Sequence, residues 1–127
     1  MPVQHVQDDS ARRLRVTATD PVTAGDFISS VERQFLDGAW SYGLLVDART
    51  LANPPPAAGI QAFVHRVLEL TAAHGPRGPV AIVARQSAMI SAAHKYVYFG
   101  GNSGSEVFWD LADAEHWLSR QMAESRP

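Results

Sequence analysis

The sequence lacks cysteine, any marked excess of one charge, and long hydrophobic runs. Without cysteine there can be no disulfides, thiol nucleophiles, iron–sulfur clusters or cysteine-bound zinc. The formal net charge is −2, so the basic excess required for binding the phosphate backbone of nucleic acids is missing. The apolar runs are too short to span a bilayer, and residues 1–10 lack the basic and apolar regions of a signal peptide. We therefore expect a cytoplasmic protein with no nucleic-acid partner and no transmembrane segment.

The composition is that of an ordinary globular protein, with 46% apolar and 19% charged residues among 127. A chain of this length forms one domain and buries a core without metals or cross-links. No internal repeat and no second domain is visible. We expect a single domain over residues 1–122 and a frayed tail over 123–127.

Five segments have the patterns of β-strands. Apolar and polar residues alternate over 13–19, which predicts a half-buried strand, and turn-forming residues join it to 3–8 as an antiparallel hairpin. The nearly all-apolar runs 42–46 and 79–84 predict strands buried on both faces, as at the centre of an α/β sheet. Residues 105–109 complete the set.

Four helices alternate with these strands. Thr23 and Asp26 are suited to the first turn of one helix, because a threonine caps the backbone and an acid complements the positive helix end. The second helix follows three prolines at 54–56, the third spans 87–99, and the fourth begins near Asp110. The order β-β-α-β-α-β-α-β-α predicts the α/β class, with helices packed on a mixed, mostly parallel sheet and an antiparallel edge.

Four segments in this order resemble the SpoIIAA-like or STAS-like family, also labelled STAS/SEC14-like. They are 13–23 (RLRVTATDPVT), 43–49 (GLLVDAR), 79–84 (PVAIVA) and 106–118 (EVFWDLADAEHWL). The most specific pieces are Leu-Val-Asp-Ala-Arg and the closing Val-Phe-Trp-Asp-Leu with its later Trp-Leu. The resemblance implies a small bacterial α/β domain without an assigned reaction, and its better understood relatives are protein-binding modules.

In the anti-sigma-factor antagonists of this family, one strand–helix junction carries a phosphorylatable serine in an Asp-Ser-Ser/Thr-Gly setting. Phosphate there adds negative charge at a helix N-terminus and alters a partner interface. The matching residues 47–56 contain no serine, and Thr50 is their one hydroxyl group. The sequence therefore does not predict this switch, and it leaves open whether Thr50 is phosphorylated.

Polar residues follow two neighbouring strands and form a first candidate site. In open α/β sheets, ligands collect at the carboxyl ends of the strands, particularly where strand order reverses. Two arginines beside an aspartate could hold a small anion or a partner's carboxylate. Alternatively, the aspartate accepts loop N–H bonds and the neighbouring arginine is solvated. The candidate ligand-binding residues are Asp47, Arg49, Thr50, Arg85 and Gln86.

The helix predicted over 87–99 has apolar or aromatic groups nearly all around it. A helix with one buried face shows a narrower stripe, and surplus Met and Tyr are typical of an interface core. The alternative is that neighbouring helices and the loop 100–104 cover this surface. The candidate interface residues are Met89, Ala93, Tyr96, Tyr98 and Phe99.

Other motifs carry no recognisable chemistry. The five histidines form no metal-binding pattern, and there is no Gly-x-Ser-x-Gly nucleophile elbow. The glycine-rich segment 100–104 follows a helix and precedes a strand, which is the opposite of the order in a phosphate loop. We therefore predict no catalytic residues, no metal and no cofactor.

Two functional hypotheses follow. The first is a non-enzymatic STAS-like protein-interaction or regulatory domain, with an unknown protein partner or self-association as a homodimer. The second is a domain that binds a small molecule, either an anion or a lipid-like compound, or an enzyme, with its site at the carboxyl edge of the central strands. A chain of 127 residues leaves little room for a lipid-sized cavity.

Overall fold

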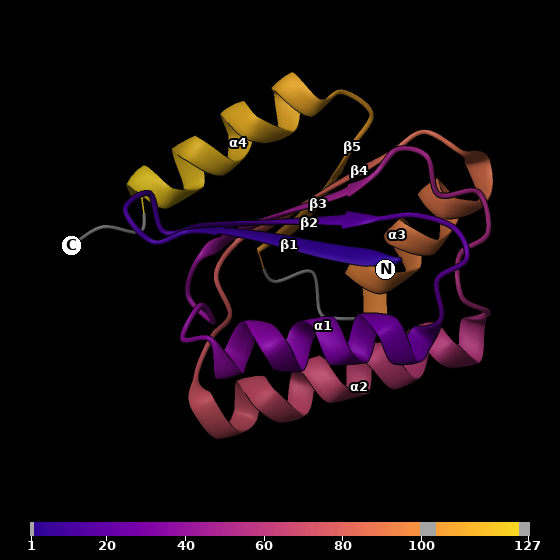
Figure 1. Cartoon of the computed structure of the whole chain (residues 1–127), viewed down its shortest axis with the longest axis horizontal. Helices are drawn as coiled ribbons and strands as arrows, with labels where there is room; N and C mark the ends of the chain where they lie inside the picture. The colour runs from indigo at the N-terminus through magenta and orange to yellow at the C-terminus, as the bar shows by residue number, and fades with distance from the viewer. Residues whose placement is uncertain (1, 100–103, 125–127) are drawn as a thin grey trace.

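The computed structural model of the protein describes residues 2–99 and 104–124 and has the predicted α/β order of elements (Figure 1). The predicted strand boundaries agree with the observed ones within two residues. The elements are β1 (Val3–Asp8), β2 (Arg13–Ala18), α1 (Ala24–Leu36), β3 (Gly43–Ala48), α2 (Ala57–His74), β4 (Val80–Ala84), α3 (Ser87–Phe99), β5 (Ser105–Phe108) and α4 (Leu111–Glu124).

The five strands form one sheet in the sequential order β1-β2-β3-β4-β5. The β1–β2 pair is antiparallel, and the three following pairs are parallel, as predicted. Because each parallel strand is added on the same side of the last and crossovers are right-handed, α1, α2 and α3 must share one face. Figure 1 shows these three helices below the sheet and α4, which is not a crossover, above it. Because the strands lie in the order in which they occur in the chain, strand order reverses nowhere in the sheet.

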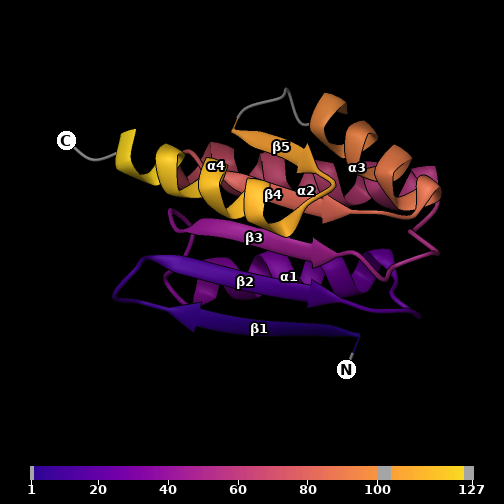
Figure 2. The same ribbon diagram turned by 90° about the horizontal axis from the view of Figure 1, so that it is seen from above.

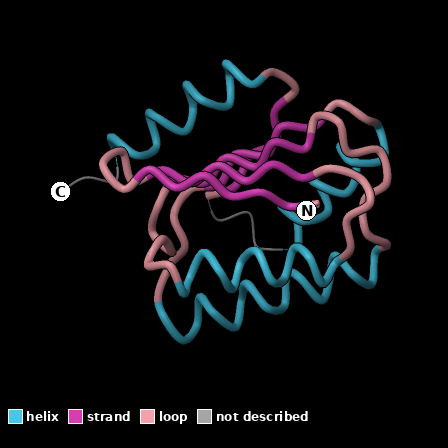
Figure 3. Tube along the Cα trace, in the orientation of Figure 1, coloured by secondary structure: helices cyan, strands magenta, loops and turns pink. Residues whose placement is uncertain are grey.

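The two helical layers cover the sheet unequally (Figures 2 and 3). Helix α4 lies over β3, β4 and β5 and leaves the same face of β1 and β2 open (Figure 2). On that open face Val6 pairs with Arg15, and Val6 is 68% exposed. The other face is covered by the three crossover helices.

Three groups of buried side chains hold these layers together. The largest fills the space between the sheet and α1–α3, and a second lies under α4. The third joins α1 to α2 through Val31, Trp40 and Leu70. The second group consists of Leu45, Ala81, Val83, Ala114 and Leu118.

Helix α1 begins where the sequence predicts. The Thr23 side chain accepts a hydrogen bond from the Asp26 backbone N–H at 3.1 Å. The Asp26 carboxylate accepts one from the Thr23 N–H at 2.8 Å. This reciprocal capping box satisfies two donors that the helix itself cannot pair.

Two of the differences from the predicted boundaries affect the site and the tail. Strand β3 continues to Ala48 because it is paired on both sides, with Thr17 opposite Asp47 and Ala84 opposite Ala48. Asp47 therefore lies within the strand and not after it. Helix α4 continues to Glu124, so the first two residues of the predicted tail are helical, and 125–127 lie outside the described residues.

Candidate functional site

Asp47 is the centre of a charged cluster on the face of the sheet that carries α4. It is 6% exposed. Its Oδ1 accepts bonds from the Arg49 backbone N–H at 3.2 Å and the Arg49 Nε at 2.9 Å. Its Oδ2 accepts bonds from Arg49 Nη2 at 2.9 Å and Arg15 Nη2 at 3.1 Å. The bonds from Arg49, aided by Arg15, lower the pKa of the Asp47 carboxyl from 3.8 to about 2.

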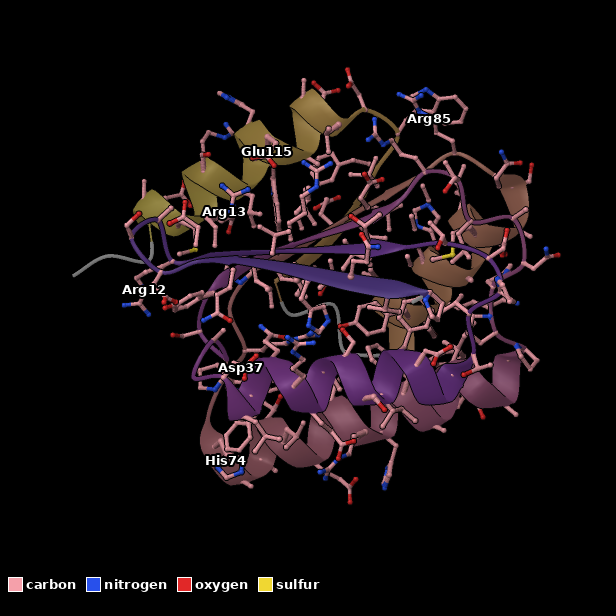
Figure 4. All side chains as sticks on the ribbon, viewed as in Figure 1. Arg12, Arg13, Asp37, His74, Arg85 and Glu115 are labelled. Carbon is pink, nitrogen blue, oxygen red and sulfur yellow. The ribbon has the colours of Figure 1, made fainter. Side chains whose placement is uncertain are left out.

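The other predicted residues of this edge do not join the cluster. The Arg85 Nε donates to the Trp109 carbonyl at 3.2 Å, and its guanidinium lies 5.8 Å from the centre of the Trp109 ring. Figure 4 shows Arg85 at the carboxyl ends of the strands. Thr50 and Gln86 are exposed. The structure thus brings Asp47 and Arg49 together and leaves Arg85 with a different partner.

The charged cluster is better described as a structural ion-pair network than as an open anion site. Arg15, which the sequence did not suggest, takes the position expected for Arg85 as the second arginine. A single carboxylate already binds both guanidinium groups. The sequential strand order also removes the crevice that forms where strand order reverses.

Helix α3 is buried where the sequence predicted part of an interface. Met89 and Ala93 are 7% and 2% exposed and belong to the core, which corrects their assignment as interface residues. Their burial, with that of Ala92, explains part of the apolar surplus of the helix. Tyr96 is half-buried against Phe63, with ring centres 5.4 Å apart. Among the predicted interface residues only Tyr98 and Phe99 are exposed.

A cavity of about 90 Å³ lies between the sheet and helices α1, α2 and α3. Its wall is almost entirely apolar, and its polar side chains are Ser30, Arg77 and Tyr96. The apolar wall includes Val16, Phe27, Val31, Leu44, Val46, Ile60, Phe63, Val80, Ile82, Met89, Ala92 and Ala93.

Arg77 is held in the wall of this cavity by neutral groups. Its Nε and Nη2 donate to the Gln34 side-chain oxygen at 3.0 and 2.6 Å. Its Nη1 donates to the Tyr96 hydroxyl at 3.1 Å, and the guanidinium lies 5.3 Å from the centre of the Trp40 ring. Burial lowers the pKa of Arg77. Nothing in the local sequence indicated this position, because Gly-Pro-Arg-Gly-Pro is typical of a solvent-exposed loop.

A serine of the cavity wall also contacts a histidine. The His5 Nε2 and Ser30 Oγ atoms are 2.7 Å apart, and burial beside Arg33 lowers the pKa of His5. Ser30 lies inside α1, where the backbone N–H groups are used by the helix and cannot form an oxyanion hole. The pair therefore lacks the surroundings of a catalytic nucleophile.

Residues 2–99 and 104–124 carry neither a metal cluster nor a membrane-spanning helix. In this part of the chain no three His, Asp or Glu side chains are placed to hold a metal ion. No helix there is long and apolar enough to cross a membrane. Most of the glycine-rich segment 100–104 lies outside the described residues.

These features define a small α/β domain with an apolar cavity on its three-helix side. Comparison with solved structures places its fold among those called SpoIIAA-like. The chain matches an uncharacterized protein of the DUF3478 family with a SpoIIAA-like fold from Shewanella loihica PV-4. The TM-score is 0.57 over 91% of both chains, at 20% sequence identity. No family model and no curated protein matches the sequence. The expected resemblance is therefore confirmed for the fold.

Proposed function

We propose that the chain is a small-molecule binding domain whose ligand occupies the cavity between the sheet and α1–α3. The cavity itself carries this proposal. Protein interiors contain few voids larger than a water molecule, and a water needs only about 10–15 Å³. A volume of about 90 Å³ with an apolar wall exceeds that several-fold. It offers water few polar partners and is suited to an apolar group.

The proposed ligand thus lies between the sheet and α1–α3 and not at the carboxyl edge of the strands. The size of the cavity favours a compact molecule over a long-chain lipid. Binding without catalysis agrees with the surroundings of the His5–Ser30 pair described above.

We expect Ala92→Leu to weaken binding, because Ala92 lines the cavity and the added carbons would occupy part of it. The exposed Ala88 on the same helix provides a matched control, Ala88→Leu. The probe is 1-hexanol, followed by the methyl NMR signals of Val16, Ile60 and Ile82. Ala92→Leu should weaken binding on the order of tenfold. The leucine would displace about two CH₂ groups of the ligand, and each buried CH₂ contributes about 0.8 kcal/mol.

The control variant should bind the alcohol as the wild type does. Methyl signals that stay unchanged at millimolar 1-hexanol would reject the cavity as a binding site. Equal affinity of the Ala92 variant and the wild type would also count against it.

A second candidate function is the non-enzymatic protein-interaction or regulatory role. The observation that favours it is the exposed aromatic pair at the end of α3. Tyr98 is 79% and Phe99 44% exposed, and their ring centres are 5.5 Å apart. Exposed aromatic groups are enriched at protein interfaces.

If this pair joins two copies of the chain, Tyr98→Asp should convert a dimer into a monomer in light scattering. Leu36→Asp is the control, because Leu36 is 78% exposed on another helix. Met89→Asp is unsuitable, because Met89 is buried and a charge there would unfold the domain. A monomeric wild type, or a mass unaffected by Tyr98→Asp, would exclude self-association through this pair.

A further inference from the structure

We propose that Arg77 is the anion-binding group of the cavity, and that the ligand is a compact apolar molecule with one carboxylate. This inference rests on the proposed function and specifies its ligand class. It is carried by the position of the Arg77 guanidinium, which is half-buried and hydrogen-bonded to neutral side chains at the wall of an apolar cavity.

Arg77 stands between two cavities. It lines the apolar one of about 90 Å³ and a second one of about 250 Å³. The two share Arg77, Val80 and Tyr96 as wall residues, and the second also has Thr71 and Ser105. A molecule with an apolar body in the first cavity would therefore present its head group to Arg77.

The charge of Arg77 has no acidic partner in the described parts of the chain. Five other arginines there form ion pairs, among them Arg13 with Glu115 and Arg66 with Glu32, whereas Arg12 and Arg85, which form none, are exposed. Figure 4 shows Arg13 and Glu115 facing one another from β2 and α4. Arg77 instead donates to the Gln34 amide and the Tyr96 hydroxyl. Enclosing a cation among neutral groups is costly, and an anionic ligand would offset that cost.

The hydrogen-bonding groups suit a carboxylate. A guanidinium has five N–H groups, and Gln34 and Tyr96 accept bonds from three of them. The planar fork of arginine pairs with the two oxygens of a carboxylate. Because the Tyr96 hydroxyl accepts from Arg77, its own proton can be donated to a ligand oxygen. A single negative charge would balance the single positive charge of Arg77.

The test compares hexanoate with hexanamide, which has the same shape and no charge, by calorimetric titration of the whole protein. We expect hexanoate to bind on the order of tenfold more tightly, as is typical for a hydrogen-bonded charge. In Arg77→Gln this preference should vanish, while hexanamide binds as before. Arg120→Gln, at an exposed site on α4, should keep the preference.

A second variant serves if Arg77→Gln does not fold. Tyr96→Phe keeps the guanidinium and removes only the hydroxyl. Hexanoate should therefore bind several-fold more weakly, and the affinity for hexanamide should be unchanged. Equal affinities of the wild type for the two probes would overturn the role of Arg77 and leave binding in the cavity intact. Absence of binding by both probes and by 1-hexanol would overturn the proposed function as well.

Discussion

Replacing Gly78 with alanine is expected to destabilise the domain by about 3 kcal/mol or more. A Cβ atom at this position would lie 2.3 Å from the Tyr42 carbonyl oxygen and 2.5 Å from that of Ser41. Both are backbone atoms, so no side chain can rotate away. The Gly78 N–H also donates to the Trp40 carbonyl at 2.9 Å, which holds the two segments together. The variant must therefore move the chain around Gly78 away from residues 40–42, or it remains unfolded.

Urea unfolding followed by circular dichroism measures this effect, and Gly25→Ala is the control. Gly25 lies in the first turn of α1, and an added Cβ would meet only the Thr23 hydroxyl at 3.6 Å. Alanine is the better helix former there, so the midpoint should stay or rise slightly. An unchanged urea midpoint in the Gly78 variant would show that the Ser41–Tyr42 backbone can shift at little energetic cost.

The same contact positions the proposed anion-binding group. Gly78 directly follows Arg77, and Trp40, whose carbonyl accepts its N–H, also packs its ring against the Arg77 guanidinium. The close approach that only glycine allows therefore fixes the chain directly after Arg77. Loss of hexanoate binding in a partly folded Gly78 variant would follow from this geometry.

The fold was predictable because its signals are local. Alternation along β2, the all-apolar runs of β3 and β4, and the Thr23–Asp26 capping box each lie within a few residues. The right-handedness of crossovers then places the three crossover helices on one face. None of these inferences needs a contact between distant residues.

The candidate sites were less predictable because their residues meet only through the fold. Arg77 acquires its environment from Gln34, Trp40 and Tyr96, which are all far from it in the sequence. Arg15 reaches Asp47 only through the register of two parallel strands. Arg85 was predicted at the carboxyl-edge site because it follows the neighbouring strand. The position of a residue after a strand does not by itself determine which side chain it pairs with.

Asp47→Asn is expected to lower the free energy of unfolding at neutral pH by about 2 kcal/mol. The Asp47 carboxylate is the shared acceptor for Arg15 and Arg49, and an amide would present a donor to one of them. Asp37→Asn is the matched control, because Asp37 pairs with Arg33 on the exposed end of α1. Exposed pairs of this kind contribute about 0.3–0.5 kcal/mol. Equal losses in the two variants would contradict a special role for Asp47.

The pH dependence of the same variant tests the cause of its effect. The folded-state pKa of Asp47 is about 2, below the ordinary 3.8. A lowered carboxyl pKa stabilises the folded state above the ordinary value, and the stabilisation is lost as pH falls toward the folded pKa. The stability difference between wild type and Asp47→Asn should therefore shrink by up to about 2 kcal/mol between roughly pH 5 and pH 2. A difference that stays constant over this range would mean that the two arginines do not act through the ionised carboxylate.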